Sequence, residues 1–191
     1  MAYLYSRYLI PEFEEYFRSG LVLDLGCGKG ALEAIIKTIP EHNFKSEFVG
    51  VDISLDMLLM AKSFTDYVVC ASAEYLPFKD RTFAAVFSVE VIEHIPKEKG
   101  FCVIKEMERV SNGVVAITTP SHFFIQDKFN TSQVGHYMRH ESYWSVSEFK
   151  RLGYSVEGLH PVREYIPLFL SKKAPYLACS VLAYKVITHD K

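Results

Sequence analysis

Short apolar runs alternate with amphipathic segments through the first 120 residues of the chain. Five runs have the length and composition of buried strands, at residues 21–25, 47–52, 67–71, 83–88 and 114–118. Residues 29–38 and 97–109 lie between such runs, and the second segment places its apolar residues on one helical face. The alternation predicts an α/β fold, a doubly wound parallel sheet with helices on both faces.

Two segments flank this alternating core. Residues 1–19 are predicted to form an N-terminal helical layer, which Pro11 divides and Gly20 ends. Residues 121–144 have no clear period and are rich in histidine and aromatic residues. Irregular segments of this length are uncommon unless they bind something or lie over a site. We therefore expect residues 121–144 to cover a substrate.

The C-terminal part of the chain carries a helix start signal and two further strands. Ser145 and Glu148 have the spacing of a capping box, which predicts a helix that ends near Gly153. The runs at 154–159 and 178–187 are typical of strands. We see no linker between these elements, so the sequence predicts one domain that spans residues 1–191.

Composition narrows the possible partners. The net charge is −2 and there is no basic run, so nucleic acid is not expected as a partner. The four cysteines are widely spaced and form no metal-binding pattern, which indicates reduced thiols in a cytoplasmic protein without a metal centre. No uncharged apolar run reaches the roughly 18 residues of a membrane span. Oligomeric state cannot be predicted from these properties.

The first apolar run leads into a glycine-rich turn, where Gly26, Gly28 and Gly30 occupy alternate positions. Glycines let the backbone turn sharply and approach a bound molecule without a clash from Cβ. The helix that follows would present free N–H groups at its start. This arrangement is typical of a nucleotide or anion cradle.

Two carboxylates indicate which nucleotide this turn binds. Asp24 lies within a buried strand, and its charge would repel a pyrophosphate but attract an ammonium or a sulfonium group. Asp52 ends the second strand, where a carboxylate can accept hydrogen bonds from both hydroxyls of a ribose. Dehydrogenases also need that second acid, so a dinucleotide enzyme remains a third, distant hypothesis. Together the two acids favour S-adenosylmethionine.

Four segments carry a family resemblance: residues 22–30 (VLDLGCGKG), 50–54 (GVDIS), 73–80 (AEYLPFKD) and 87–95 (FSVEVIEHI). In this order they resemble the class I S-adenosylmethionine-dependent methyltransferases, of the small-molecule subfamily that includes quinone-biosynthesis enzymes (type 11). The resemblance covers about residues 20–120. It implies a Rossmann-like methyltransferase fold with a seven-stranded, mostly parallel sheet and an antiparallel last strand. It also implies S-adenosylmethionine as cofactor and a small molecule as methyl acceptor.

The resemblance assigns nine positions to the cofactor: Asp24, Gly26, Cys27, Gly28, Asp52, Ile53, Ser72, Ala73 and Ser88. Asp24 would face the ammonium group, Asp52 the ribose and Ile53 the adenine ring. Ser72 stands where the family usually has an aspartate, and Ala84 stands where it often has an acid. These two departures motivate an alternative, a non-catalytic cofactor-binding or partner protein on the same fold.

The acceptor side offers fewer signals. A hydroxyl or phenol acceptor needs a base, for which His94 and His136 are the candidates, whereas an amine or activated carbon needs no strong base. Glu90, Glu93 and His94 either line the site, or the glutamates are solvated and His94 closes a helix end. Cys27 is expected to be a small loop residue, since no base is paired with it. No Asp-Pro-Pro-Tyr-like motif follows the fourth strand, which also argues against a nucleic-acid substrate.

Overall fold

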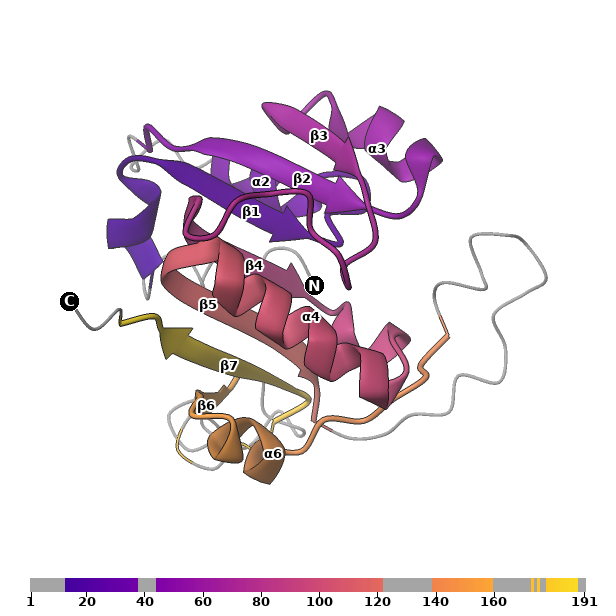
Figure 1. Cartoon of the computed structure of the whole chain (residues 1–191), viewed down its shortest axis with the longest axis vertical. Coiled ribbons are helices and arrows are strands. Elements are labelled where there is room, and N and C mark those ends of the chain that lie inside the picture. The colour runs from indigo at the N-terminus through magenta and orange to yellow at the C-terminus, as the bar shows by residue number, and fades with distance from the viewer. Residues whose placement is uncertain are drawn as a thin grey trace. The chain divides into compact units, whose positions relative to one another are not determined.

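The computed structural model describes residues 13–37, 44–121, 139–159, 173, 175 and 178–188 (Figure 1). The chain divides into two compact units. Unit 1 comprises Met1–Ser88, Val103–Val115 and Val186–Lys191, and unit 2 comprises Val89–Cys102 and Ala116–Lys185. The expectation of one domain over 1–191 stays a prediction.

Unit 1 holds the N-terminal elements: η1 (Glu14–Phe17), β1 (Leu21–Leu25), α2 (Ala31–Lys37), β2 (Glu47–Asp52), α3 (Leu55–Ala61) and β3 (Tyr67–Cys70). It also holds most of β4 (Phe83–Val89), the second half of α4 (Lys97–Val110) and the first half of β5 (Ser111–Pro120). β1 is parallel to both β2 and β4, with Leu23 opposite Val49 and Val86. The carboxyl ends of these strands therefore lie at one edge of the sheet.

Unit 2 holds η2 (Ile92–His94), α6 (Val146–Arg151), β6 (Ser155–Gly158) and nearly all of β7 (Ser180–Val186). β6 and β7 pair antiparallel. The seven strands have the order β3-β2-β1-β4-β5-β7-β6. This mixed sheet, whose last strand is antiparallel, confirms the predicted fold class.

Aromatic side chains fill the core of unit 1 beneath β4. Phe17 stacks on Phe87, with ring centroids 5.2 Å apart and an interplanar angle of 9°, and Phe13 meets the same ring edge-on at 5.7 Å. All three are buried, and each such side chain contributes roughly 1.5–3 kcal/mol by leaving water. This packing anchors the central strands whose ends carry the candidate site.

The predicted element boundaries hold where the local pattern was strong. β1 and β2 have the predicted bounds, and Ser54 caps α3 by accepting a hydrogen bond from the Met57 N–H. The capping box of α6 is also present. All four cysteines lie among the described residues, and none forms a disulfide, as expected of reduced thiols.

Other boundaries were wrong. α2 begins at Ala31 rather than at residue 29, because Gly30 has a left-handed φ of 76°. β5 runs from Ser111 to Pro120, well beyond the predicted 114–118, and includes the buried polar residues Thr118 and Thr119. The predicted N-terminal helical layer stays a prediction: residues 1–12 lie outside the described part, and the described residues include helical Phe13 and the 3-10 turn η1.

Candidate functional site

The glycine turn after β1 is held against the end of β2. The N–H groups of Gly26 and Cys27 both donate to the carbonyl of Val51, at 2.7 and 3.1 Å. Gly28 has a φ of 53°, and a Cβ placed there would meet no described atom within 4 Å. At Gly30 a Cβ would lie 3.2 Å from the backbone of Ala61. The turn thus packs closely on α3 at one end and has open space at Gly28.

Asp52 fastens this turn to β2. Its Oδ2 accepts a hydrogen bond from the Gly28 N–H at 3.0 Å, and its Oδ1 accepts one from the Ser54 N–H at 2.8 Å. A carboxylate has about four lone-pair sites, so acceptor capacity remains on both oxygens. The two backbone donors hold the carboxylate in one orientation before any ligand binds.

Asp24 lies in an acidic interior. Its side chain is only 3% exposed, and burial raises its pKa well above the usual range, with the charges of Glu33 and Asp52 adding to the effect. Glu33 of α2 is fully buried, and burial raises its pKa as well. Hydrogen bonding with the Thr65 and Asp24 side chains lowers the pKa of Glu33, but burial outweighs it. Such a group favours a nearby positive charge.

Sequence reasoning identified Asp24 but missed Glu33. Glu33 precedes Ile36 by three positions on α2, and Ile36 is buried, so the helical period did place this glutamate on the inward face. Cys27 is buried beside these acids, and burial raises the pKa of its thiol. This environment suits the expected packing role better than that of a nucleophile.

The remaining predicted cofactor residues follow the ends of β2, β3 and β4. Ile53 comes directly after Asp52 and is 53% exposed. Ser72 and Ala73 follow β3, and the Ser72 hydroxyl accepts a hydrogen bond from the Glu74 N–H at 3.3 Å. Ser88 is buried opposite Leu25, and its hydroxyl has no hydrogen-bond partner within the described ranges.

All nine predicted cofactor positions therefore lie in unit 1, at the carboxyl ends of four neighbouring strands. Ligands of open α/β sheets bind at this edge. The open space at Gly28, the unpartnered Ser88 hydroxyl and the oriented Asp52 carboxylate fit a polar nucleoside ligand. The buried acids Asp24 and Glu33 fit its cationic part.

His94 lies in unit 2, as the last residue of η2. Its Nδ1 lies 3.0 Å from the carbonyl oxygen of Arg139, and because a carbonyl only accepts, Nδ1 carries the proton and Nε2 the lone pair. Burial lowers the pKa of His94; the Arg139 carbonyl opposes this, and His140 lowers it further. The neutral imidazole is favoured. His136, the other base candidate, lies outside the described residues.

The burial of Glu93 contradicts the alternative in which this glutamate is solvated. It is 2% exposed rather than solvated, and its Oε2 accepts a hydrogen bond from the Thr119 hydroxyl at 3.0 Å. Burial and the charge of Glu90 raise the pKa of Glu93 to about 8. The backbone turns between β4 and η2 at Glu90, which has a left-handed φ of 54°.

His140 joins this group from a distant part of the chain. Its ring lies edge-on to that of His94, with centroids 5.0 Å apart. Glu93, His94 and His140 each offer one ligand atom, and these atoms all lie within 4.8 Å of one another. Sequence spacing gave no signal for this cluster, because 46 residues separate the two histidines.

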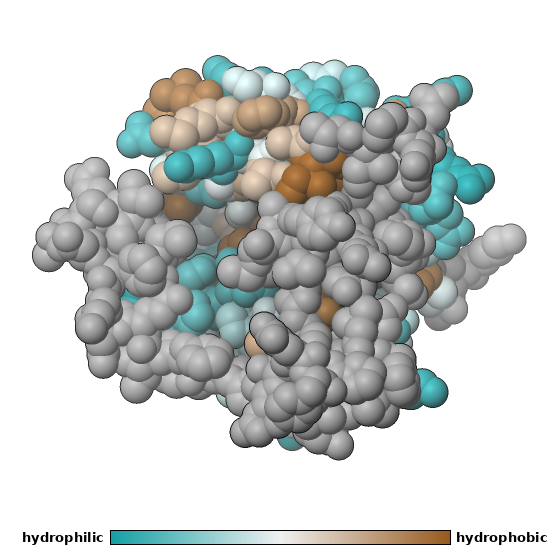
Figure 2. All heavy atoms as spheres, turned by 180° about the vertical axis from the view of Figure 1, so that it is seen from behind, coloured by the Kyte–Doolittle hydropathy of each residue, from teal (hydrophilic) through white to brown (hydrophobic). Residues whose placement is uncertain are grey.

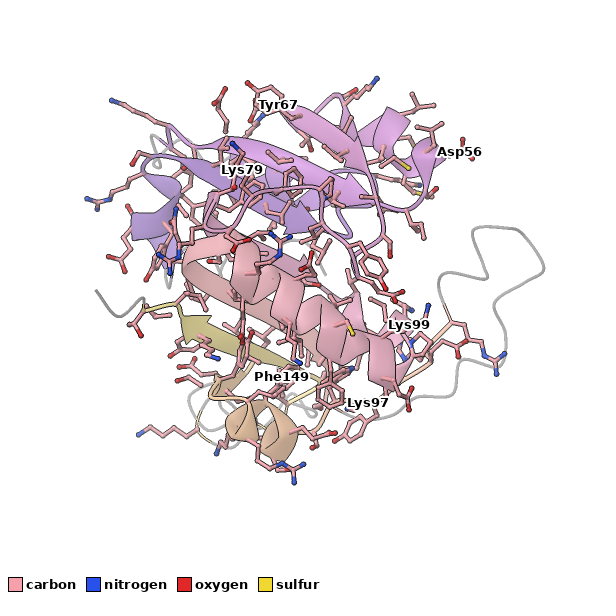
Figure 3. All side chains as sticks on the ribbon, in the orientation of Figure 1. Asp56, Tyr67, Lys79, Lys97, Lys99 and Phe149 are labelled. Atoms are coloured by element: carbon pink, nitrogen blue, oxygen red, sulfur yellow. The ribbon has the colours of Figure 1, made fainter. Side chains whose placement is uncertain are left out.

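The segment expected to cover a substrate, residues 121–144, is described at residue 121 and from residue 139 onward. Trp144 is buried there, with its ring 5.0 Å from that of Phe101, and so packs in the interior. Lys97 donates a hydrogen bond to the Tyr143 carbonyl and pairs with Glu148 at 2.9 Å (Figure 3). Among the described residues, no helix has the length and apolar character needed to cross a membrane.

Comparison with known proteins finds a domain family and several relatives that this chain resembles. Residues 23–117 match the family described as a methyltransferase domain. Over 179 residues, the chain is 26% identical to an uncharacterised protein of Methanocaldococcus jannaschii, a match that covers 92% of the chain and 72% of the relative. Over 117 residues it is 28% identical to the mitochondrial ubiquinone biosynthesis O-methyltransferase of Arabidopsis thaliana, covering 57% of the chain and 35% of that enzyme.

The fold also resembles solved structures. One is a putative methyltransferase in a complex with the Haloferax volcanii Trm112 methyltransferase activator, with a TM-score of 0.64, 14% identity and coverage of 100% of this chain and 96% of that one. The likeness to this structure supports the fold, and the match of residues 23–117 to a methyltransferase domain family supports S-adenosylmethionine, the predicted cofactor. The partial match to the ubiquinone enzyme does not place the chain in the quinone-biosynthesis subfamily.

Proposed function

We propose, on the premise that residues 23–117 form a methyltransferase domain, that the chain transfers a methyl group from S-adenosylmethionine to a small-molecule acceptor. The observation that carries the proposal is the Asp52 carboxylate, oriented by two backbone donors beside the open glycine turn. Bound S-adenosylmethionine supplies an electrophilic methyl group on a sulfonium centre. The protein then has to bind, align and desolvate the reactants.

Each cofactor residue takes a role that suits its environment. Asp52 accepts hydrogen bonds from the ribose hydroxyls. Asp24, next to the buried Glu33, faces the cationic amino-acid part of the cofactor. Gly26, Cys27 and Gly28 line the methionine part. The other four positions complete the pocket: Ile53 on the adenine face, Ser72 and Ala73 at the adenine edge, and Ser88 near the methionyl carboxylate or sulfonium.

A small acceptor is favoured over nucleic acid by the net charge of −2 and the absence of a basic run in the sequence. The similarity to a ubiquinone O-methyltransferase supports a hydroxyl or phenol acceptor. For such an acceptor, His94 or His136 would be the general base. The lowered pKa of His94 keeps its imidazole neutral and able to take a proton near pH 7.

Calorimetry and a transfer assay test this function in sequence. Titration with S-adenosylhomocysteine should give a dissociation constant of about 1 μM to 1 mM, the usual range for enzyme ligands. Incubation with methyl-labelled S-adenosylmethionine and a panel of phenols, hydroxyacids and amines should then label one class. Absence of heat and of thermal stabilisation would refute cofactor binding; binding without transfer to any acceptor would favour the non-catalytic alternative.

A second candidate function is suggested by an apolar surface on unit 1. Six exposed apolar residues lie on and around α3 and β3: Ile53, Leu55, Leu59, Met60, Phe64 and Tyr67. β3 ends the strand order, and Figure 2 shows apolar side chains gathered over this part of unit 1. The resemblance to a methyltransferase bound to an activator supports a partner of that kind on this surface.

Light scattering of the chain with a Trm112-type activator tests the partner. A stable one-to-one complex is expected, and Leu59→Lys should dissociate it. Asp56→Lys is the matched control, because Asp56 lies on the same helix and is exposed (Figure 3). No complex, or equal loss with both variants, would contradict the assignment of this surface.

A further inference from the structure

Two chain segments are joined in unit 2 before any ligand is present. The backbone carbonyl of Glu93 accepts hydrogen bonds from the N–H groups of Glu141 and Ser142, at 2.7 and 2.9 Å. The Ser142 hydroxyl donates to the carbonyl of Ile92 at 3.1 Å and is buried. Glu141 and Ser142 are thereby fixed against η2, and the preceding residue, His140, lies close to Glu93 and His94.

Two of the three side chains are also oriented by a second partner. Glu93 uses Oε2 to accept from Thr119, which leaves the other carboxylate oxygen to bind a ligand. His94 donates its Nδ1 proton to the Arg139 carbonyl, which leaves the lone pair of Nε2. Metal-binding histidines almost always donate their second ring N–H to a carbonyl or carboxylate in this way, since the bond fixes both tautomer and ring orientation.

The three donor atoms lie close enough for one ion. Ligand atoms about 2.0–2.2 Å from a metal are at most about 4.4 Å apart, and small side-chain rotations bring donors within 4.8 Å to that spacing. We propose that Glu93, His94 and His140 form a binding site for a divalent transition-metal ion. Glu93 is 2% exposed, so its carboxylate is held in the interior beside the two histidines.

The donor set indicates the class of metal. Two imidazole nitrogens and one carboxylate oxygen suit Zn²⁺, Co²⁺, Mn²⁺ or Fe²⁺, whereas Mg²⁺ and Ca²⁺ prefer oxygen ligands throughout. Three protein ligands leave at least one coordination position for water or another oxygen. The site is composed of unit 2 residues only, and none of the nine proposed cofactor positions belongs to it.

Metal binding would change the role of His94. A coordinated Nε2 has no lone pair left, so His94 would be a ligand and not the general base. If the proposed methyl transfer to an oxygen acceptor is correct, the ion would lower the pKa of a bound hydroxyl and so replace that base. This consequence rests on the proposed function, whereas the metal site itself does not.

Direct titration of metal-free, full-length protein with Co²⁺ tests the site, because Co²⁺ bound by nitrogen and oxygen ligands absorbs visible light. We expect one ion per chain, displaced by Zn²⁺ but not by Mg²⁺. His140→Ala and Glu93→Gln should each weaken Co²⁺ binding at least about 100-fold, as even an outer-sphere partner contributes 10–100-fold. Far-UV dichroism and the affinity for S-adenosylhomocysteine should stay unchanged in His140→Ala.

Two control variants separate this site from accidental binding. Cys102→Ser removes an exposed thiol of unit 2, and Glu98→Gln removes an exposed carboxylate near η2; neither should alter Co²⁺ binding. The proposal is overturned if Co²⁺ does not bind, if His140→Ala binds it as tightly as the parent chain, or if Cys102→Ser abolishes binding. Because the absorbance of bound Co²⁺ is the readout, failure of the methyl-transfer assay would not overturn the proposed metal site.

Discussion

Replacement of Asp52 is the most direct probe of the proposed cofactor site. In Asp52→Ala the acceptors for the Gly28 and Ser54 N–H groups are lost together with those for a ribose. Each hydrogen bond to a charged group contributes roughly 1.5–3 kcal/mol. Two ribose hydroxyls then correspond to about 3–6 kcal/mol, and at about 1.4 kcal/mol per factor of ten, affinity should fall about 10²- to 10⁴-fold.

Calorimetric titration with S-adenosylhomocysteine measures this loss. Asp52→Asn keeps one acceptor oxygen and should lie between Asp52→Ala and the parent chain. Asp56→Ala is the matched control: it removes the same charge from an exposed position four residues later and should bind within a few-fold of the parent chain.

A loosened glycine turn could also weaken binding, and a double-mutant cycle separates the two causes. The 2′-deoxy analogue of S-adenosylhomocysteine lacks one proposed contact. The parent chain should bind this analogue more weakly than S-adenosylhomocysteine, whereas Asp52→Ala should bind the two ligands almost equally. The opposing result is that the change from S-adenosylhomocysteine to the 2′-deoxy analogue costs Asp52→Ala as much affinity as it costs the parent chain. That result would show that the Asp52 carboxylate does not bind the ribose.

Three further predictions concern the interior. Burial raises the pKa of Asp24, so its carboxyl stays protonated above the usual pH range of an aspartate. A cationic cofactor favours the ionised form, so binding should release a proton. The affinity for the cofactor should therefore increase as the pH rises through the raised pKa. Calorimetry in buffers of different ionisation heat measures this release, which Asp24→Asn should abolish. Gly50→Ala places a Cβ 2.8 Å from the Cys27 sulfur and should lower urea stability by about 1–3 kcal/mol, with Cys27→Ala restoring part of the loss; an unchanged midpoint would contradict the packing. Lys97→Met removes the hydrogen bond to Tyr143 and the cation lying 3.6 Å from the Trp144 ring centre, and should cost about 1–3 kcal/mol in the same assay, against less than about 0.5 for exposed Lys105→Met.

The pH dependence of folding stability that Asp24 causes is opposite in sign to that of an ion-paired acid. A carboxyl whose pKa is raised in the folded protein stabilises the fold fully below its usual pKa, and that contribution is lost as pH rises through the raised value. The cofactor-free chain should therefore lose part of its stability above the usual pKa of an aspartate. S-adenosylhomocysteine, which carries an ammonium group, should restore it.

Local patterns predicted most strand bounds and placed the proposed cofactor positions at one edge of the sheet. β1 and β2 follow from apolar runs, and Asp24 and Asp52 are placed by their distance from the glycines along two adjacent parallel strands. Parallel strands end at one edge of a sheet, so residues near those ends come together without any knowledge of side-chain packing. The family resemblance could therefore name positions that the structure gathers in one unit.

The interior polar groups needed the tertiary structure. The sequence left open whether Glu93 lines a site or is solvated, and only the structure shows that it is buried. Likewise, the meeting of His94 with His140 depends on hydrogen bonds between segments 46 residues apart. Sequence alone determined the sheet, the glycine turn and the positions of the two acids proposed to bind the nucleotide, because these follow from local periodicity and strand order. The burial of Glu93 and the proximity of Glu93, His94 and His140 were decided by long-range packing, which no local pattern encodes.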